Sequence, residues 1–208
     1  MDDKKCKVCR RAGEKLFLKG DRCFSPKCAF EKKAYPPGRR DSERKHRSTA
    51  TEFGIQLREK QKVRNVYRLS EKQFAKYVKN ASTAGENPSE KLYEQLETRL
   101  DNIVFRLGLA KSRSESRQLV SHGHITVNGR RTSVPSRQMK IGDIVSIRKG
   151  SLEKKPFVGL AEKQNKAPVP QWLTFDAKKP EAIVRALPVL DKAVSGYNLT
   201  SVIEFYSR

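Results

Sequence analysis

The apolar positions of the chain follow helical spacing in its middle third and strand spacing directly afterwards. In KLYEQLETRLDNIVFRLG, residues 91–108, apolar side chains recur at intervals of three and four, which places them on one face of a helix. Gly108 ends this segment, as glycine commonly does after a helix. In HITVNGRRTSV, residues 124–134, Ile125 and Val127 alternate with polar residues, and Asn128-Gly129 is a preferred hairpin turn. The pattern predicts a helix followed by a hairpin.

Two further helices carry start signals. Ser70 precedes Gln73 and Ser112 precedes Glu115 with the spacing of a capping box, and the second of these helices ends at Gly123. Residues 51–68 are also helical in pattern, but they are strongly basic and only moderately amphipathic. The sequence MKIGDIVSIRKG, which follows the hairpin, predicts another strand. Residues 97–150 are therefore expected to form a compact α+β unit of two short helices, a hairpin and a further strand.

The last fifty residues are less regular. Residues 151–180 are rich in Lys and Pro and predict mostly loop. EAIVRALPVL, residues 181–190, is expected to be a short helical piece broken at Pro188. The tail LTSVIEFYSR fits either a last strand or a helix.

The charge of the chain indicates a polyanionic partner. Lys and Arg number 45 against 23 Asp and Glu, a net charge of +22, while hydrophobic residues make up only 36% of the sequence. Solubility alone needs a net charge of about 2–8. No stretch approaches the roughly 18 apolar residues of a membrane span, and no apolar leader follows the first Met. We expect a soluble cytoplasmic protein that binds nucleic acid, with a merely solvated basic surface as the alternative.

All four cysteines lie in the first 28 residues. Cys6, Cys9, Cys23 and Cys28 form a C-x2-C pair and a C-x4-C pair, separated by thirteen residues. Two close pairs of thiols are typical of a tetrahedral Zn²⁺ site with four thiolates, which leaves no open position for catalysis. Leu16, Phe17 and Leu18 between them are expected to form a small strand. The spacing predicts a structural Zn²⁺ clip whose binding free energy folds a short basic arm.

Two other uses of these cysteines, disulfides and a redox motif, fit the sequence poorly. Disulfides need an oxidising compartment, and no export signal is present. A redox C-x-x-C would need a strand–helix context that KKCKVCRRAG lacks. An iron–sulfur cluster remains the alternative metal centre.

Candidate RNA-binding residues fall in two basic stretches. Residues 39–68 are a basic tether followed by a basic helix, and the alternative for the tether is a disordered linker. Residues 111–131 combine a helix start with a polar, cationic hairpin, which suits a folded RNA backbone. For the arginines of this helix the alternative is a solvated face, and for the two histidines it is capping or packing. The candidates are Arg39, Arg40, Arg44, Lys45, Arg47, Arg58, Lys60, Lys62, Arg64, Arg68, Lys111, Ser112, Arg113, Arg117, His122, His124, Asn128, Arg130 and Arg131.

Three long segments resemble one protein family. REKQKVRNVYRLSEKQF, LETRLDNIVFRLGLAKSRSESRQLVSHGHITVNGRR and the terminal VIEFYSR resemble the bacterial-type small-subunit ribosomal protein S-four family. The cysteine spacing followed by YPPG is similar to the zinc-binding-arm subgroup of that family. The resemblance implies an α+β fold: a zinc-clipped arm at 1–45, a helical domain at 46–96 completed by 190–208, and an inserted S-four-type RNA-binding module at 97–160. A loop-rich segment at 161–208 is expected to pack back on these domains.

The resemblance also implies a structural function. Proteins of this family bind small-subunit rRNA at a multi-helix junction of its 5′ domain and nucleate subunit assembly. They contact small-subunit protein five and other ribosomal proteins near the path by which mRNA enters. The resemblance implies no enzymatic activity, no membrane and no small-molecule substrate. Two alternatives share the same module: an RNA-modifying enzyme, for which no catalytic motif is visible, and an RNA-binding translational repressor.

Overall fold

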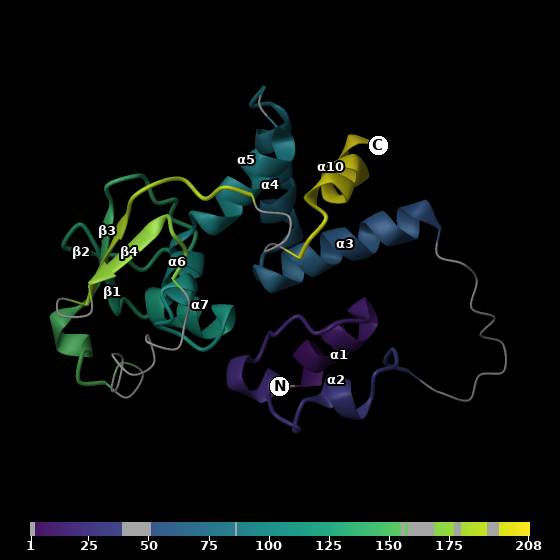
Figure 1. The fold of residues 1–208 in the computed structure, drawn as a ribbon, viewed down its shortest axis with the longest axis horizontal. Coiled ribbons are helices and arrows are strands. Elements are labelled where there is room, and N and C mark those ends of the chain that lie inside the picture. Colours follow the sequence, from purple (N-terminus) through teal and green to yellow (C-terminus); the bar gives the residue numbers. More distant parts are fainter. Residues whose placement is uncertain are drawn as a thin grey trace. The chain divides into compact units, whose positions relative to one another are not determined.

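The computed structural model describes residues 3–38, 51–85, 87–154, 157, 169–176, 180–190 and 196–208. The chain divides into two compact units, Met1–Ser89 with Asp191–Arg208, and Glu90–Leu190. Figure 1 shows a helical first unit and a second unit in which a small sheet packs against helices. No helix in these ranges is long and apolar enough to cross a membrane.

The cysteine-rich arm is built from short helices. It contains α1 (Asp3–Ala12), the 3-10 helix η1 (Gly20–Cys23) and α2 (Ala29–Lys32). The strand predicted at residues 16–18 is wrong, because Phe17 has a left-handed backbone with φ of 50°. The chain turns at this residue, so Leu16 is buried and Phe17 is exposed.

Three long helices form the rest of the first unit. They are α3 (Glu52–Val66), α4 (Glu71–Ser82) and α10 (Leu199–Ser207). Ser70 Oγ accepts a hydrogen bond from the Gln73 N–H at 3.3 Å, which confirms the predicted cap of α4. The tail, which the sequence left as strand or helix, is the helix α10. It packs against α3, where Phe205 lies 5.4 Å from Phe53 between ring centroids.

In the second unit the predicted helix at 91–108 is interrupted. Its first part is α5 (Pro88–Glu97), which begins just before the unit boundary, and its second part is α6 (Leu100–Arg106). Between them Arg99 is extended and pairs with the backbone of Gln138 as an isolated bridge, while the Leu100 N–H donates to the Arg137 carbonyl. The break lets the Arg99 side chain turn inward, where it is fully buried. The prediction of one continuous helix is therefore wrong.

Helix α7 (Arg113–Ser121) begins and ends as its sequence signals predict. Ser112 Oγ accepts from the Glu115 N–H at 3.3 Å, which confirms the predicted cap. Gly123 follows with φ of +71°, the left-handed conformation that glycine adopts without strain.

The second unit contains a five-stranded antiparallel sheet in the order β2-β1-β3-β5-β4. Its strands are β1 (Ile125–Val127), β2 (Arg130–Arg131), β3 (Ile144–Ile147), β4 (Leu173–Asp176) and β5 (Glu181–Val184). Asn128 and Gly129, with φ of 51° and 75°, form the predicted hairpin turn. The helix predicted at 181–190 is wrong, because residues 181–184 form β5 and residues 185–190 contain no helix. Ala182 and Val184 alternate with exposed residues and pair as β5 with β3 and β4.

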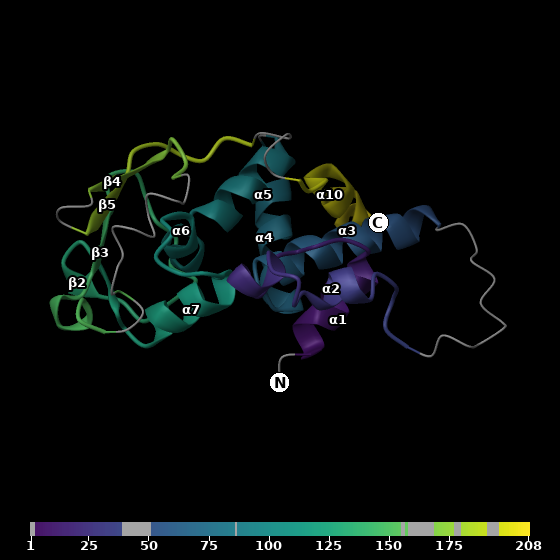
Figure 2. The ribbon, with the colours of Figure 1, turned by 60° about the horizontal axis from the view of Figure 1, so that its bottom comes forward.

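Helices α6 and α7 cover one face of this sheet (Figure 2). The shared core includes Ile103 and Val104 of α6, Val120 of α7 and Ile125 of β1, all fully buried. Trp172, the one tryptophan of the sequence, packs against this core while remaining partly exposed. The observed fold is the expected mixture of helices with a small antiparallel sheet. Because α7 and β1 share this core, their positions relative to each other are set by its packing.

Candidate nucleic-acid interface and cysteine cluster

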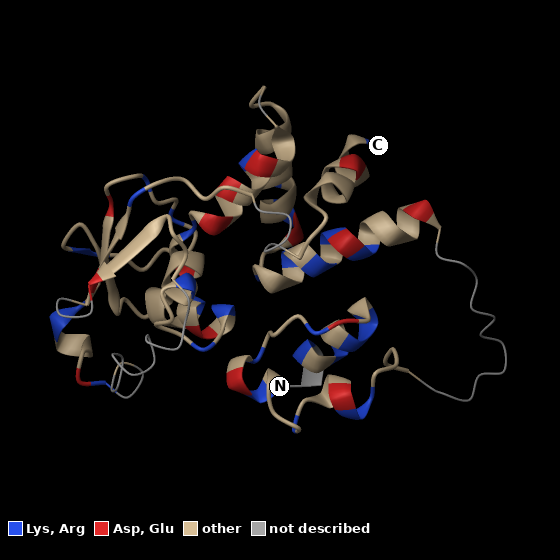
Figure 3. Cartoon of the chain, viewed as in Figure 1, with Lys and Arg blue, Asp and Glu red and all other residues tan. Residues whose placement is uncertain are grey.

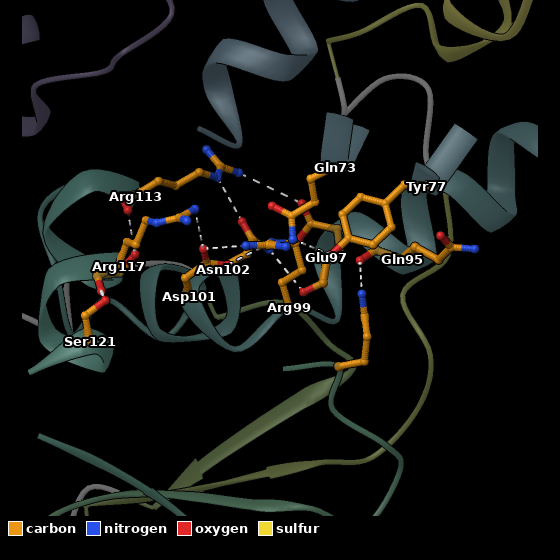
Figure 4. Close-up of polar contacts among 12 residues, drawn as sticks. Gln73, Tyr77, Gln95, Glu97, Arg99, Asp101, Asn102, Arg113, Arg117 and Ser121 are labelled. Atoms are coloured by element: carbon orange, nitrogen blue, oxygen red, sulfur yellow. Dashed lines mark hydrogen bonds and ion pairs between the residues drawn. The ribbon is translucent and has the colours of Figure 1, made fainter. Parts of the chain in front are cut away.

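The junction of α5, α6 and α7 holds a network of buried charges (Figure 4). Glu97 is fully buried, and its carboxylate accepts two hydrogen bonds of 2.8 Å from the Arg106 guanidinium. Asp101 accepts in the same two-pronged way from buried Arg99, at 3.0 and 2.8 Å. Such bidentate pairs are short and geometrically specific. Each buried carboxylate therefore has one arginine as its close partner.

Two further arginines reach the same carboxylates at longer range. Arg113 Nη2 lies 3.9 Å from Glu97, and Arg117 Nη1 lies 3.7 Å from Asp101. Arg113 is also held by a 2.8 Å hydrogen bond from Nε to Asn102 Oδ1, and its guanidinium lies over the Phe105 ring at 4.6 Å. These contacts fix the Arg113 side chain from three sides.

The network has an excess of positive charge. Its four arginines share two carboxylates, so these six side chains carry a net charge of +2. Arg113 and Arg117 keep side-chain exposures of 18% and 35%, so part of each faces solvent. Because the excess charge belongs to oriented, partly exposed guanidinium groups, this surface is suited to phosphate. The alternative of a freely solvated helix face does not describe Arg113.

Side chains of α7 and its N-cap accept hydrogen bonds from the backbone N–H groups at the start of this helix. The Glu115 carboxylate accepts from the Lys111 N–H at 2.8 Å, while Ser112 caps the helix from the other side. Ser112 is buried, and the Lys111 side chain is exposed. The structure thus gives Ser112 a capping contact, and the cationic side chains of α7 remain the candidates for phosphate.

His122 and His124 flank Gly123 beside the hairpin. His124 Nδ1 lies 3.0 Å from the hydroxyl of Ser151, in the 3-10 helix η2 (Lys149–Ser151). Burial lowers the pKa of His124, and the positive charges of neighbouring Lys154, His122, Arg131 and Arg148 lower it further. His124 therefore makes a packing contact, which was the alternative to RNA binding for the two histidines. The charged groups around it are cations.

Arg131 lies directly against the backbone at Gly123. Its Nη2 donates to the His122 carbonyl at 3.4 Å, and a Cβ added to Gly123 would lie 2.2 Å from Arg131 Nε. The bare backbone of Gly123 therefore leaves room for the Arg131 side chain. Arg130 is its exposed neighbour in β2.

Asn128 has a structural role at the tip of the hairpin. Its amide donates to Asp143 Oδ1 at 2.8 Å and its Oδ1 accepts from the Ile144 N–H at 2.8 Å. Burial would raise the pKa of Asp143, but hydrogen bonds from the Lys140 N–H and from Asn128 outweigh it and lower the pKa. These contacts tie the hairpin turn to the turn before β3.

The basic helix α3 uses several of its cations within the chain. Lys60 forms an ion pair with Glu71 and lies over the rings of Phe205 and Tyr206, at 4.8 and 5.2 Å. Lys62 pairs with carboxylates at Glu14 and Glu59, and Arg64 pairs with Glu71 at 2.8 Å. Of the five candidates on and just after this helix, Arg58 and Arg68 remain exposed.

Arg58 is accompanied by cations of the arm. Together with Lys7 and Arg11 of α1 it lines a hollow of about 510 Å³ between α1 and α3. Figure 3 shows Lys and Arg along both helices. Lys7 and Arg11 are not among the RNA-binding residues predicted from the sequence. Their four-residue spacing places them on one face of a helix, a signal that is visible only once α1 is recognised. The tether candidates Arg39, Arg40, Arg44, Lys45 and Arg47 lie outside the described residues.

The four cysteines come from three elements of the arm. Cys6 and Cys9 lie on α1, Cys23 ends η1 and Cys28 precedes α2. All four are free thiols, and Cys9, Cys23 and Cys28 are buried. The Lys19 N–H points to Cys23 Sγ at 3.4 Å. Burial raises the pKa of Cys9, and the charges of the other three thiols act in the same direction.

These thiols suit a soft metal by their chemistry, because thiolates are preferred ligands of Zn²⁺. Across the described ranges, however, no group of three or more His, Cys, Asp or Glu is arranged to hold a metal ion. The predicted Zn²⁺ clip is therefore not shown by the described residues.

Comparison with known proteins gives a consistent result along the chain. Residues 1–97 match the model of the ribosomal protein S4/S9 N-terminal domain, and residues 98–145 match the S4 domain. The chain is 45% identical to small ribosomal subunit protein uS4 of Syntrophomonas wolfei, over 99% of this chain and 98% of that protein. It is 46% identical to uS4 of Caldicellulosiruptor bescii, over 98% and 96%. The chain therefore belongs to the ribosomal protein S4 family.

Proposed function

We propose that this protein is a structural constituent of the small ribosomal subunit that binds small-subunit rRNA. The observation that carries the proposal is the likeness to uS4 proteins, which extends over nearly the whole of both chains. The oriented arginines of α7 lie within the residues matched as an S4 domain and give the likeness a physical basis. The role is architectural, with no chemical step, in the cytoplasm.

Binding is driven by charge and shape. The net charge of +22 makes association with phosphates favourable through the release of counterions. Phosphate contacts set the position of a protein on its RNA, and a folded RNA is recognised largely by its shape, so cations held in fixed positions are suited to it. Arg113, which Asn102 and Phe105 hold, and Arg131, which lies against Gly123, are such cations.

Finer parts of the proposal rest on the family resemblance. We place the protein at a multi-helix junction of the rRNA 5′ domain, where it nucleates assembly. Its neighbours there would be small-subunit protein five and the mRNA near the path by which mRNA enters the subunit. The exposed cations of α3, α7 and the hairpin support an rRNA contact.

The test is a titration of a 5′-domain rRNA transcript with the full chain over a range of salt concentrations. If about ten phosphates are contacted, log K falls against log salt with a slope of about −7 to −9. An S4-domain control, the double variant Arg113→Gln with Arg117→Gln, should bind more weakly with a smaller slope. Salt-independent binding, or an affinity no greater than for an unrelated RNA of equal length, would refute the proposal.

We also propose that Cys6, Cys9, Cys23 and Cys28 hold a structural Zn²⁺, as in the zinc-binding-arm subgroup. The two close pairs of cysteines, the burial of three of the thiols and the N–H directed at Cys23 support this ligand set. When bound, the ion would supply folding free energy to an arm with a small apolar core. The basic residues beside the thiols would offset the negative charge of four thiolates.

Metal analysis of the purified chain tests this site. We expect one zinc per chain, and four thiols that react with a thiol reagent only after a chelator is added. Iron with visible absorbance would indicate the iron–sulfur alternative. A metal-free arm with four immediately reactive thiols would contradict both.

A further inference from the structure

Two exposed aromatic side chains lie together on the cysteine-rich arm. The rings of Phe17 and Phe24 are stacked, with centroids 4.9 Å apart and an angle of 24° between their planes. Phe17 is 46% exposed and Phe24 is 75% exposed. Within residues 3–38 they are the only exposed large hydrophobic side chains. Covering these open rings would remove apolar surface from water, and flat aromatic faces favour another flat ring as their partner.

The loop between them holds the pair in place. Phe24 directly follows η1, and its N–H donates to the Asp21 carbonyl at 3.1 Å. The same loop directs the Lys19 N–H to Cys23 Sγ. Phe17 has φ of 50°, a left-handed conformation that is unfavourable for a residue with a Cβ and persists only where the surrounding structure imposes it. The stack is therefore a fixed feature of the arm.

The surroundings of the pair favour nucleic acid. Residues 3–38 contain eleven Lys and Arg against four Asp and Glu. Arg22 and Lys27, close to Phe24 in sequence, line a hollow of about 310 Å³ with Arg10, Lys32 and Lys33. Two rings on so basic an arm are too small for the apolar centre of a protein interface, which buries about 800 Å² on each side. A single flat base next to a phosphate backbone fits both the rings and the charge.

We propose that the Phe17–Phe24 pair is a stacking platform for one unpaired base of the RNA. The proposal rests on the RNA-binding function proposed above and adds a contact that reads the face of a base. The base would lie on the open face of Phe24 and extend the stack by one ring. Cations of the same arm that are close to Phe24 in sequence, Arg22 and Lys27, would hold the flanking phosphates.

The test compares ring loss with charge loss in the full chain. Phe24→Leu keeps an apolar side chain but removes the flat ring, so binding of the 5′-domain rRNA transcript should weaken about tenfold at every salt concentration. Its slope of log K against log salt should equal that of the unchanged protein, because no phosphate contact is lost. Phe24→Tyr should restore the affinity. The control Arg22→Gln should instead reduce the slope by about 0.7–0.9.

The outcomes separate the hypotheses. If the unchanged protein shows no salt-dependent binding to the transcript, the proposed function itself fails. If it binds and Phe24→Leu binds within twofold of it, the platform is refuted. A loss in Phe24→Leu that Phe24→Tyr does not restore also refutes it. Normal rRNA binding with reduced incorporation of Phe24→Leu into small subunits would assign the pair to a protein neighbour and overturn the proposal.

Discussion

Replacing Glu97 with Gln tests whether the buried charge network stabilises the second unit. The carboxylate of Glu97 accepts two hydrogen bonds from Arg106 and one of 2.9 Å from Asn102 Nδ2, and it faces Arg113 at 3.9 Å. Gln has nearly the same shape, but it has one acceptor oxygen and presents an NH₂ group to the same donors. The substitution therefore removes the charge and brings donors together without creating a cavity.

The size of the effect follows from burial. Removing one partner of a buried ion pair costs about 3–5 kcal/mol, because the other charge loses its compensation. Glu97 has no exposed surface, whereas the Arg106 side chain is 27% exposed and can recover some hydration. We therefore expect the lower end, about 3 kcal/mol. With a urea m-value of about 1.5 kcal/mol per molar for a unit of this size, the midpoint should fall by about 2 M.

Trp172 reports on this unit alone. It is the single tryptophan of the chain and packs on the core of the second unit, so its fluorescence follows the unfolding of that unit in urea. The matched control is Glu94→Gln on the same helix, which removes a partly exposed ion pair with Lys91. That change should cost about 0.5 kcal/mol or less. Equal midpoints for the two variants would refute the reasoning.

The same variant distinguishes oriented charge from total charge in RNA binding. Glu97→Gln raises the net charge of the chain by one, so binding that depended on charge alone would become tighter. If the carboxylate orients Arg113, binding becomes weaker despite the added positive charge. An affinity that rises equally in Glu97→Gln and in Glu94→Gln would contradict the orienting role, because both variants add the same charge.

Three other changes give separate expectations. Gly123→Ala should weaken rRNA binding, because the added Cβ would displace the Arg131 side chain. The control is Gly129→Ala, which has a similar φ but no atom within 4 Å of the added Cβ. An equal loss of binding in both variants would exclude this explanation. Ser112→Ala should destabilise the second unit by about 1 kcal/mol in the Trp172 assay, because the cap of α7 is lost. Burial would raise the pKa of Glu71, but hydrogen bonds from Lys60, Tyr206 and Arg64 lower it below 4.5. The stability that this carboxylate contributes is thus present above pH 4.5 and is lost as the pH falls through the lowered pKa. The protection factors of the α10 amides, which correct for the intrinsic pH dependence of exchange, should fall over that interval. Glu71→Gln should remove this fall.

Local signals in the sequence predicted what local physics determines. Ser70 and Ser112 cap their helices because the partner N–H lies three residues ahead, within the same turn. Asn128 and Gly129 form the hairpin because both tolerate positive φ. Such rules need no knowledge of the rest of the fold, and here they held.

Features that depend on distant partners were missed. The apolar stripe of residues 91–108 continues smoothly across Arg99, yet the chain breaks there because Arg99 pairs with the backbone of Gln138 and with Asp101. Residues 181–184 have no strong strand signal of their own, and they become β5 because β3 and β4 supply hydrogen-bonding edges. Tertiary contacts override local preference in both cases.

The sequence also could not show which cations of the candidate site are used within the chain. Sequence identified Lys60, Arg64, Arg113 and Arg117 as equivalent cations, since each is simply a positive side chain on a predicted helix. In the fold, Lys60 and Arg64 form ion pairs with Glu71, whereas Arg113 and Arg117 are outer members of a network with more arginines than carboxylates. The distinction arises because Glu71 pairs directly with both α3 cations. The buried carboxylates Glu97 and Asp101 instead have Arg106 and Arg99 as close partners and reach the α7 arginines only at longer range. Substituting α7 arginines should therefore change rRNA binding more than substituting those α3 cations, although the change in net charge is the same.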